Sequence, residues 1–90
     1  MKETSEELSS WLSNLTEEEI TLQEELIGWQ NELINCLCKK DQMLKSGDNV
    51  GAEIAEAQAV YSVSEAVKIR ERLSDISILK NVYGADAEAN

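Results

Sequence analysis

The 90-residue chain has no histidine, no proline and no phenylalanine, and it contains only four glycines and two cysteines. Without histidine it lacks the commonest general base and the usual ligand sets for zinc. The absence of proline removes the strongest helix breaker, which favours long helices. Cys36 and Cys38 would point about 200° apart on a helix, so we expect free thiols in a reducing compartment. The sequence thus predicts no metal site and no cofactor.

Acidic residues dominate the charge of the chain. It has 18 acidic and 8 basic side chains, which give a net charge of −10 at pH 7. Such a surface disfavours direct binding to nucleic acid or to anionic lipid. No apolar run approaches the ~18 residues of a membrane span, and the polar N-terminal residues lack the apolar core of a secretory signal. We therefore expect a cytoplasmic protein that does not enter a membrane.

Helix start and stop signals divide the chain, which we treat as one domain over 1–90. Capping boxes at Thr4–Glu7 and Thr16–Glu19 predict a short helix over about 5–13 and a long helix over 17–45, unless the two fuse. A cluster containing Gly47 and Gly51 predicts a turn over 46–51. A second long helix then covers about 50–83, Gly84 ends it, and residues 84–90 form a frayed tail.

A heptad seam runs along both long helices. In the first half of the chain, alternating steps of four and three select Leu8, Leu12, Leu15, Glu19, Leu22, Leu26, Trp29, Leu33, Cys36, Lys40 and Met43. The matching seam in the second half is Ala52, Ala55, Ala59, Ser62, Ala66, Ile69, Leu73, Ile76, Lys80 and Tyr83. Folding at the turn places Trp29 opposite Ala66 and brings Glu25 near Arg72. This pattern predicts an all-α antiparallel helical hairpin, and a long helix in an oligomeric bundle is the alternative.

Large apolar residues also lie outside the seam. Among them are Ile20, Ile27 and Ile34 in the first long helix and Val60, Val63 and Val67 in the second. We interpret them as an exposed face that binds a partner. The alternative is a homodimer core in which two hairpins form a four-helix bundle. Trp11 is a candidate anchor, because it leaves the seam and large aromatic residues are common at binding hot spots.

An acidic edge follows the seam in the first long helix. Glu18, Glu25 and Glu32 repeat every seven residues, and Glu17 and Glu24 lie next to them. This edge is either a solvated helix face, a surface for a basic partner, or a mimic of nucleic-acid phosphates.

No arrangement of side chains in the sequence points to catalysis. There is no Ser-His-Asp set, no Cys-His pair and no glycine-rich phosphate loop, so we expect a non-enzymatic protein. The sequence predicts an interaction module, such as an adaptor, assembly subunit or small chaperone, that offers an apolar stripe to a partner helix. The alternatives are an acidic inhibitor that mimics nucleic acid and a purely structural homo-oligomer.

Overall fold

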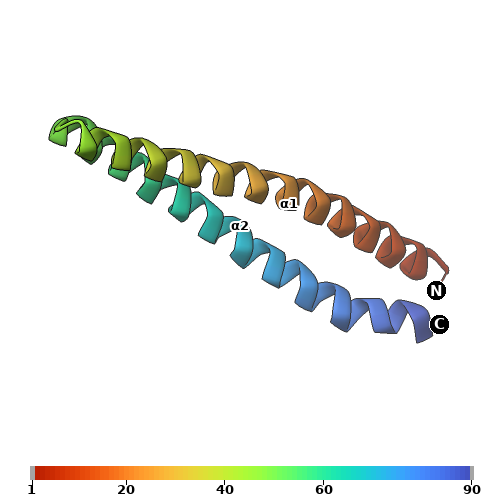
Figure 1. Ribbon diagram of the computed structural model, residues 1–90. Coiled ribbons are helices and arrows are strands. Elements are labelled where there is room, and N and C mark those ends of the chain that lie inside the picture. The colour runs from red at the N-terminus through yellow and green to blue at the C-terminus, as the bar shows by residue number, and fades with distance from the viewer. Residues whose placement is uncertain (1, 90) are drawn as a thin grey trace.

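The protein is a hairpin of two long helices, α1 (Lys2–Lys45) and α2 (Asn49–Ala89). The computed structural model describes the backbone of residues 2–89 and the side chains of residues 6–84. The helices run antiparallel, so both chain ends lie at the same end of a rod of 68 × 15 × 14 Å (Figure 1). This confirms the predicted all-α antiparallel hairpin.

Of the two arrangements that the sequence left open, a separate helix over 5–13 is not formed and the two segments are fused, because α1 is continuous from Lys2 to Lys45. No glycine or proline stands between residues 5 and 27, so nothing forces a break at Asn14. Thr16 does not cap a new helix. Its hydroxyl donates a hydrogen bond to the carbonyl oxygen of Leu12 (3.1 Å), as threonine does inside a helix. The predicted cap at Thr4 lies outside the described side chains.

The turn is shorter than predicted and covers Ser46–Asp48. Gly47 has a positive φ of 84°, and its N–H donates to the carbonyl oxygen of Leu44 (3.2 Å). The N–H of Asp48 donates to the carbonyl oxygen of Met43 (2.8 Å), which completes a Schellman motif at the end of α1. The carboxylate of Asp48 accepts a bond from the N–H of Gly51 (2.9 Å) and so caps α2.

The predicted end of α2 at Gly84 is also wrong, since the helix continues to Ala89 and includes most of the predicted tail. Gly84 keeps a helical backbone, unlike Gly47, and so does not act as a left-handed terminating residue. The residues that follow are mainly alanine and acidic residues, which a helix accommodates at low cost.

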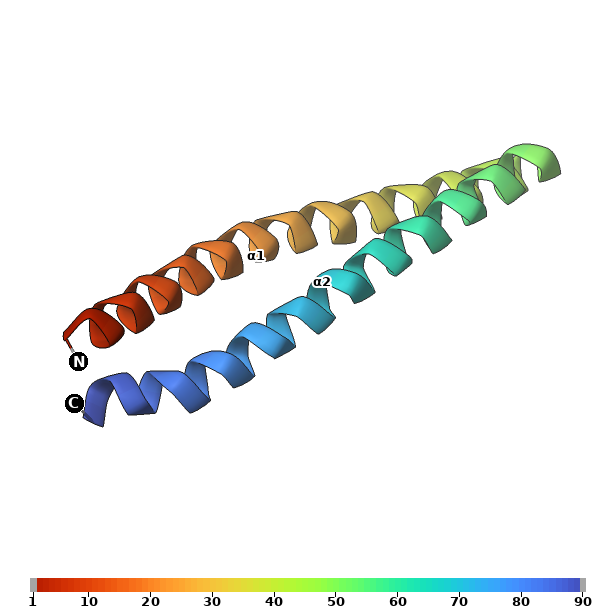
Figure 2. The same cartoon turned by 180° about the vertical axis from the view of Figure 1, so that it is seen from behind.

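The predicted seam forms the contact between the helices. The buried residues are Leu15, Cys36, Ala52, Ala55, Ala59, Ser62, Ala66, Ile69 and Ile76, all of which are seam positions. Small residues near the turn allow the helices to approach closely, and α1 and α2 diverge toward their free ends (Figures 1 and 2). The aromatic pairs Trp29–Tyr61 and Trp11–Tyr83 fill the wider part, with ring centroids 5.6 and 5.5 Å apart.

One cross-helix ion pair differs from expectation, and a second was not predicted. Arg72 does not pair with Glu25; its guanidinium binds both carboxylate oxygens of Glu18, one heptad earlier, with an Nη2–Oε1 distance of 3.0 Å. Glu19 and Lys80, the charged residues within the seam, pair with each other at 3.3 Å. Both pairs fix the antiparallel register of the half nearest the chain ends.

Candidate functional site

The six aliphatic residues that were predicted to bind a partner are exposed in the hairpin. Their exposed fractions range from 43% to 64%. Ile20, Ile27 and Ile34 repeat every seven residues and form one stripe along α1, and the valines form a second stripe on α2. We call this set the aliphatic face, and its members are Ile20, Ile27, Ile34, Val60, Val63 and Val67.

Both stripes lie on the same side of the hairpin. On one flank of the seam, Glu18 of α1 meets Arg72 of α2, and Glu25 and Gln58 line a common groove. The isoleucines and the valines lie on the other flank of their helices. In an antiparallel pair, equivalent flanks of the two helices share one side, so the two stripes form one continuous surface.

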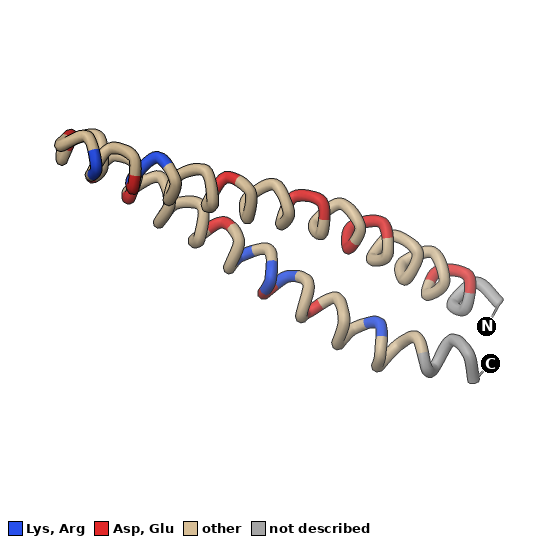
Figure 3. Tube along the Cα trace, viewed as in Figure 1, with Lys and Arg blue, Asp and Glu red and all other residues tan. Residues whose placement is uncertain are grey.

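The border of the aliphatic face on α1 is acidic. Glu17 and Glu24 lie one turn before and one turn after Ile20, and both are exposed. The positions between the isoleucine stripe and the seam are uncharged and hold Thr16, Gln23 and Gln30. Acidic residues follow the first half of α1, whereas most basic residues of α2 lie in its central part (Figure 3). A partner that covers this face therefore meets apolar groups first and carboxylates at one edge.

Trp11, the predicted anchor, is not part of the aliphatic face. It lies seven residues before Glu18 and thus on the opposite flank of α1. Its ring packs edge-on against Tyr83 with an interplanar angle of 80°, and 38% of the residue stays exposed. The structure therefore places Trp11 in the contact between the helix ends.

The acidic edge divides into two rows. Glu17 and Glu24 face outward, whereas Glu18, Glu25 and Glu32 lie beside the seam. The hydrogen bonds from Arg72 hold the pKa of the Glu18 carboxyl below its usual value, so this carboxylate is paired and charged at neutral pH. Its neighbour Glu19 is paired with Lys80. The edge is thus partly neutralised from α2.

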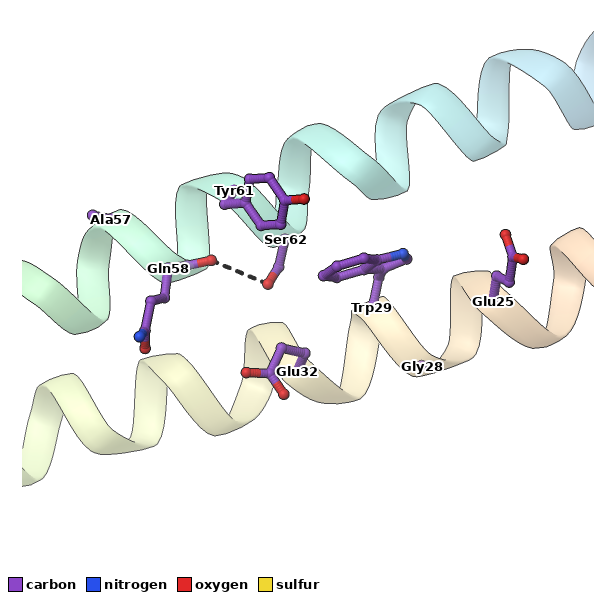
Figure 4. A pocket seen from close by; sticks show the side chains of 8 residues that line it. All are labelled: Glu25, Gly28, Trp29, Glu32, Ala57, Gln58, Tyr61 and Ser62. Atoms are coloured by element: carbon purple, nitrogen blue, oxygen red, sulfur yellow. Dashed lines mark hydrogen bonds between the residues drawn. The ribbon is translucent and has the colours of Figure 1, made fainter.

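A groove of about 670 Å³ opens between the helices on the acidic flank. It is lined by Glu25, Gly28, Trp29, Glu32, Ala57, Gln58, Tyr61 and Ser62 (Figure 4). Trp29 and Ser62 were predicted as seam residues, and no opening beside them was predicted. The available signal was Tyr61 outside the seam together with the small residues Gly28 and Ala57, which leave space around the two rings.

The two cysteines occupy different environments, and both are free. Cys36 is buried, and its thiol donates a hydrogen bond to Oε1 of Glu32 (Sγ–O 3.6 Å). Burial and this carboxylate raise the pKa of the Cys36 thiol, so it stays protonated at neutral pH. Cys38 is exposed on the outer side of α1. Cys36 is therefore a packing residue that also orients one wall of the groove.

Two further findings concern the part of the chain that the structure describes. There, no three cysteine, aspartate or glutamate side chains come together as a metal-binding cluster. Neither helix has a stretch apolar and long enough to cross a membrane.

In comparisons with known proteins, no family model, curated protein or solved structure matches this chain.

Proposed function

We propose that the hairpin is a non-enzymatic interaction module that binds an amphipathic helix of a protein partner on its aliphatic face. The observation that carries the proposal is the exposure of six large aliphatic side chains from two helices on one side of the molecule. Apolar stripes on a pair of helices are a common docking surface for a third helix.

The energetics support a partner that covers the aliphatic face. Fully burying one such side chain contributes about 1.5–3 kcal/mol, so covering the exposed half of all six contributes on the order of 5–9 kcal/mol. Association itself costs about 4–15 kcal/mol, so apolar burial alone gives weak binding. The accessible surface of 6546 Å² also exceeds the roughly 5,200 Å² of a compact monomer of this mass. The rod therefore exposes more surface than a compact monomer of the same mass. A stable complex also needs polar contacts, because apolar burial alone gives weak binding.

The charge of the border indicates the partner's chemistry. Two copies of this chain would each bring a net charge of −10 to the interface, and the exposed carboxylates of Glu17 and Glu24 border the aliphatic face in both copies. A helix with lysine or arginine beside its apolar stripe would instead form ion pairs with them. We therefore favour a basic amphipathic helix from another protein over a second copy of this chain.

The acidic-inhibitor alternative stays a prediction and has less support from the charge geometry. Glu18, Glu25 and Glu32 are seven residues apart, a spacing of about 10.5 Å along a helix. Phosphates of one DNA strand follow each other about every 3.4 Å of helix axis. Arg72 also neutralises Glu18. This row therefore resembles a strand of phosphates poorly.

The proposal is tested with Ile27→Asp and a matched control, Ile78→Asp. Ile27 and Ile78 are both 57% exposed, but Ile78 lies outside the aliphatic face. The probe is a labelled synthetic helix with a leucine heptad stripe flanked by lysines, and fluorescence anisotropy reports its binding. We expect Ile27→Asp to weaken binding by at least about tenfold and Ile78→Asp by less than about twofold. Equal losses for the two variants would contradict a site on this face.

A further inference from the structure

The groove on the flank opposite the aliphatic face has an aromatic floor. Trp29 of α1 and Tyr61 of α2 meet edge to face, with an interplanar angle of 78°. Gly28, Ala57 and Ser62 surround them with little side-chain volume. The Ser62 hydroxyl is satisfied within α2, because it donates to the carbonyl oxygen of Gln58 at 3.1 Å. The groove thus presents aromatic surface that the seam does not cover (Figure 4).

Two carboxylates stand on the α1 side of this aromatic floor. Glu25 and Glu32 are exposed and lie one turn on either side of Trp29 (Figure 4). Within the side chains that the structure describes, the carboxylates in ion pairs are those of Glu18, Glu19, Asp41, Glu56 and Glu65, so neither Glu25 nor Glu32 takes part in one. Glu32 accepts only the weak bond from the protonated Cys36 thiol. The groove therefore combines aromatic rings with carboxylates that no cation of the described chain balances.

We propose that this groove binds the guanidinium group of an arginine side chain from a protein partner. A guanidinium stacks on an aromatic face and donates paired hydrogen bonds to a carboxylate in its own plane. Trp29 supplies the stacking surface, and Glu25 or Glu32 accepts the paired bonds. An ammonium group cannot form the planar, paired contact, so arginine binds more tightly than lysine. This site goes beyond the proposed function, because it lies on the other flank and does not require the aliphatic face.

The test uses the full chain with Trp11→Phe, so that Trp29 is the remaining tryptophan. A tetra-arginine peptide is titrated while Trp29 fluorescence is recorded, and tetra-lysine serves as the comparison. The proposal predicts a saturable change, with arginine binding at least about threefold more tightly than lysine. Replacing both groove carboxylates, Glu25→Gln with Glu32→Gln, is expected to weaken arginine binding by at least about tenfold.

The matched control is Glu17→Gln with Glu24→Gln, which removes the same charge from the outward row of α1. It is expected to weaken binding by less than about threefold, because it leaves the groove intact. Circular dichroism checks that every variant remains helical. Equal weakening by the two double variants would show a general attraction to the acidic chain and would overturn the proposal. So would a fluorescence change that does not saturate, or equal binding of arginine and lysine. None of these outcomes depends on the Ile27→Asp experiment, so the two proposals can fail separately.

Discussion

Two glycines, Gly47 and Gly28, have different roles in the hairpin, and only Gly47 belongs to the turn that closes it. Gly47 occupies a left-handed conformation, whereas Gly28 is inside α1 and has open space where a Cβ would stand. No part of α2 approaches Gly28 closely, and its position beside Trp29 is its one distinguishing feature. The same substitution should consequently have opposite effects at the two sites.

We expect Gly47→Ala to reduce the free energy of unfolding by about 1–2 kcal/mol, because alanine is strained in the left-handed conformation. We expect Gly28→Ala to raise it by about 0.5–1 kcal/mol, because alanine is the better helix former and meets no neighbour there. Urea unfolding followed by circular dichroism measures both changes. A stabilising Gly47→Ala would contradict the observed turn.

A second prediction at this scale concerns the ion pair of Glu18 with Arg72. Because Arg72 lowers the pKa of Glu18 in the folded state, the pair stabilises the fold above the unfolded pKa of about 4.3. That contribution is lost as the pH falls through the lower folded value. Glu18→Gln removes it, so the difference in stability between the wild-type protein and the variant should shrink between pH 6 and pH 3, roughly the carboxyl titration range. A difference that does not depend on pH would show that the pair is not formed.

At the scale of the helices, the seam was predictable because its burial depends only on the heptad period. Whether α1 breaks near Asn14 was left open by the sequence, because the capping box at Thr16 marks a possible helix start but cannot interrupt a helix without a breaker. The groove was not predictable, because its volume depends on how far apart the axes lie where Trp29 meets Tyr61. A period in the sequence carries no information on that distance.

The pair of Glu19 with Lys80 provides a test of the seam. Both side chains are about one-quarter to one-third exposed, so the pair is partly desolvated and replaces apolar packing. We expect the double variant Glu19→Leu with Lys80→Leu to raise the free energy of unfolding by about 1 kcal/mol. This gain is at the low end of the range for apolar residues that replace a buried ion pair, because solvent still reaches both side chains. Lys80→Leu alone should destabilise it, because Glu19 then lies in the seam without its partner. Thermal unfolding measures both, and a stabilising single variant would contradict the pairing.

For the whole molecule, the rod shape explains why so much apolar surface is exposed. A compact domain of 90 residues has a radius of gyration of about 12 Å, whereas this chain has 19.9 Å. Two helices can bury only one seam between them, so the aliphatic face and the groove lie on opposite flanks of that seam. The hairpin is therefore suited to bind more than one element of a partner at once.

The occupant of the aliphatic face is tested by light scattering behind size exclusion, with circular dichroism on each fraction, over a roughly hundredfold range of concentration. If the aliphatic face binds a helix of another protein, we expect a helical monomer of 10.0 kDa at every concentration. A helical species of twice that mass would contradict it, because the face would then belong to a second copy of the chain.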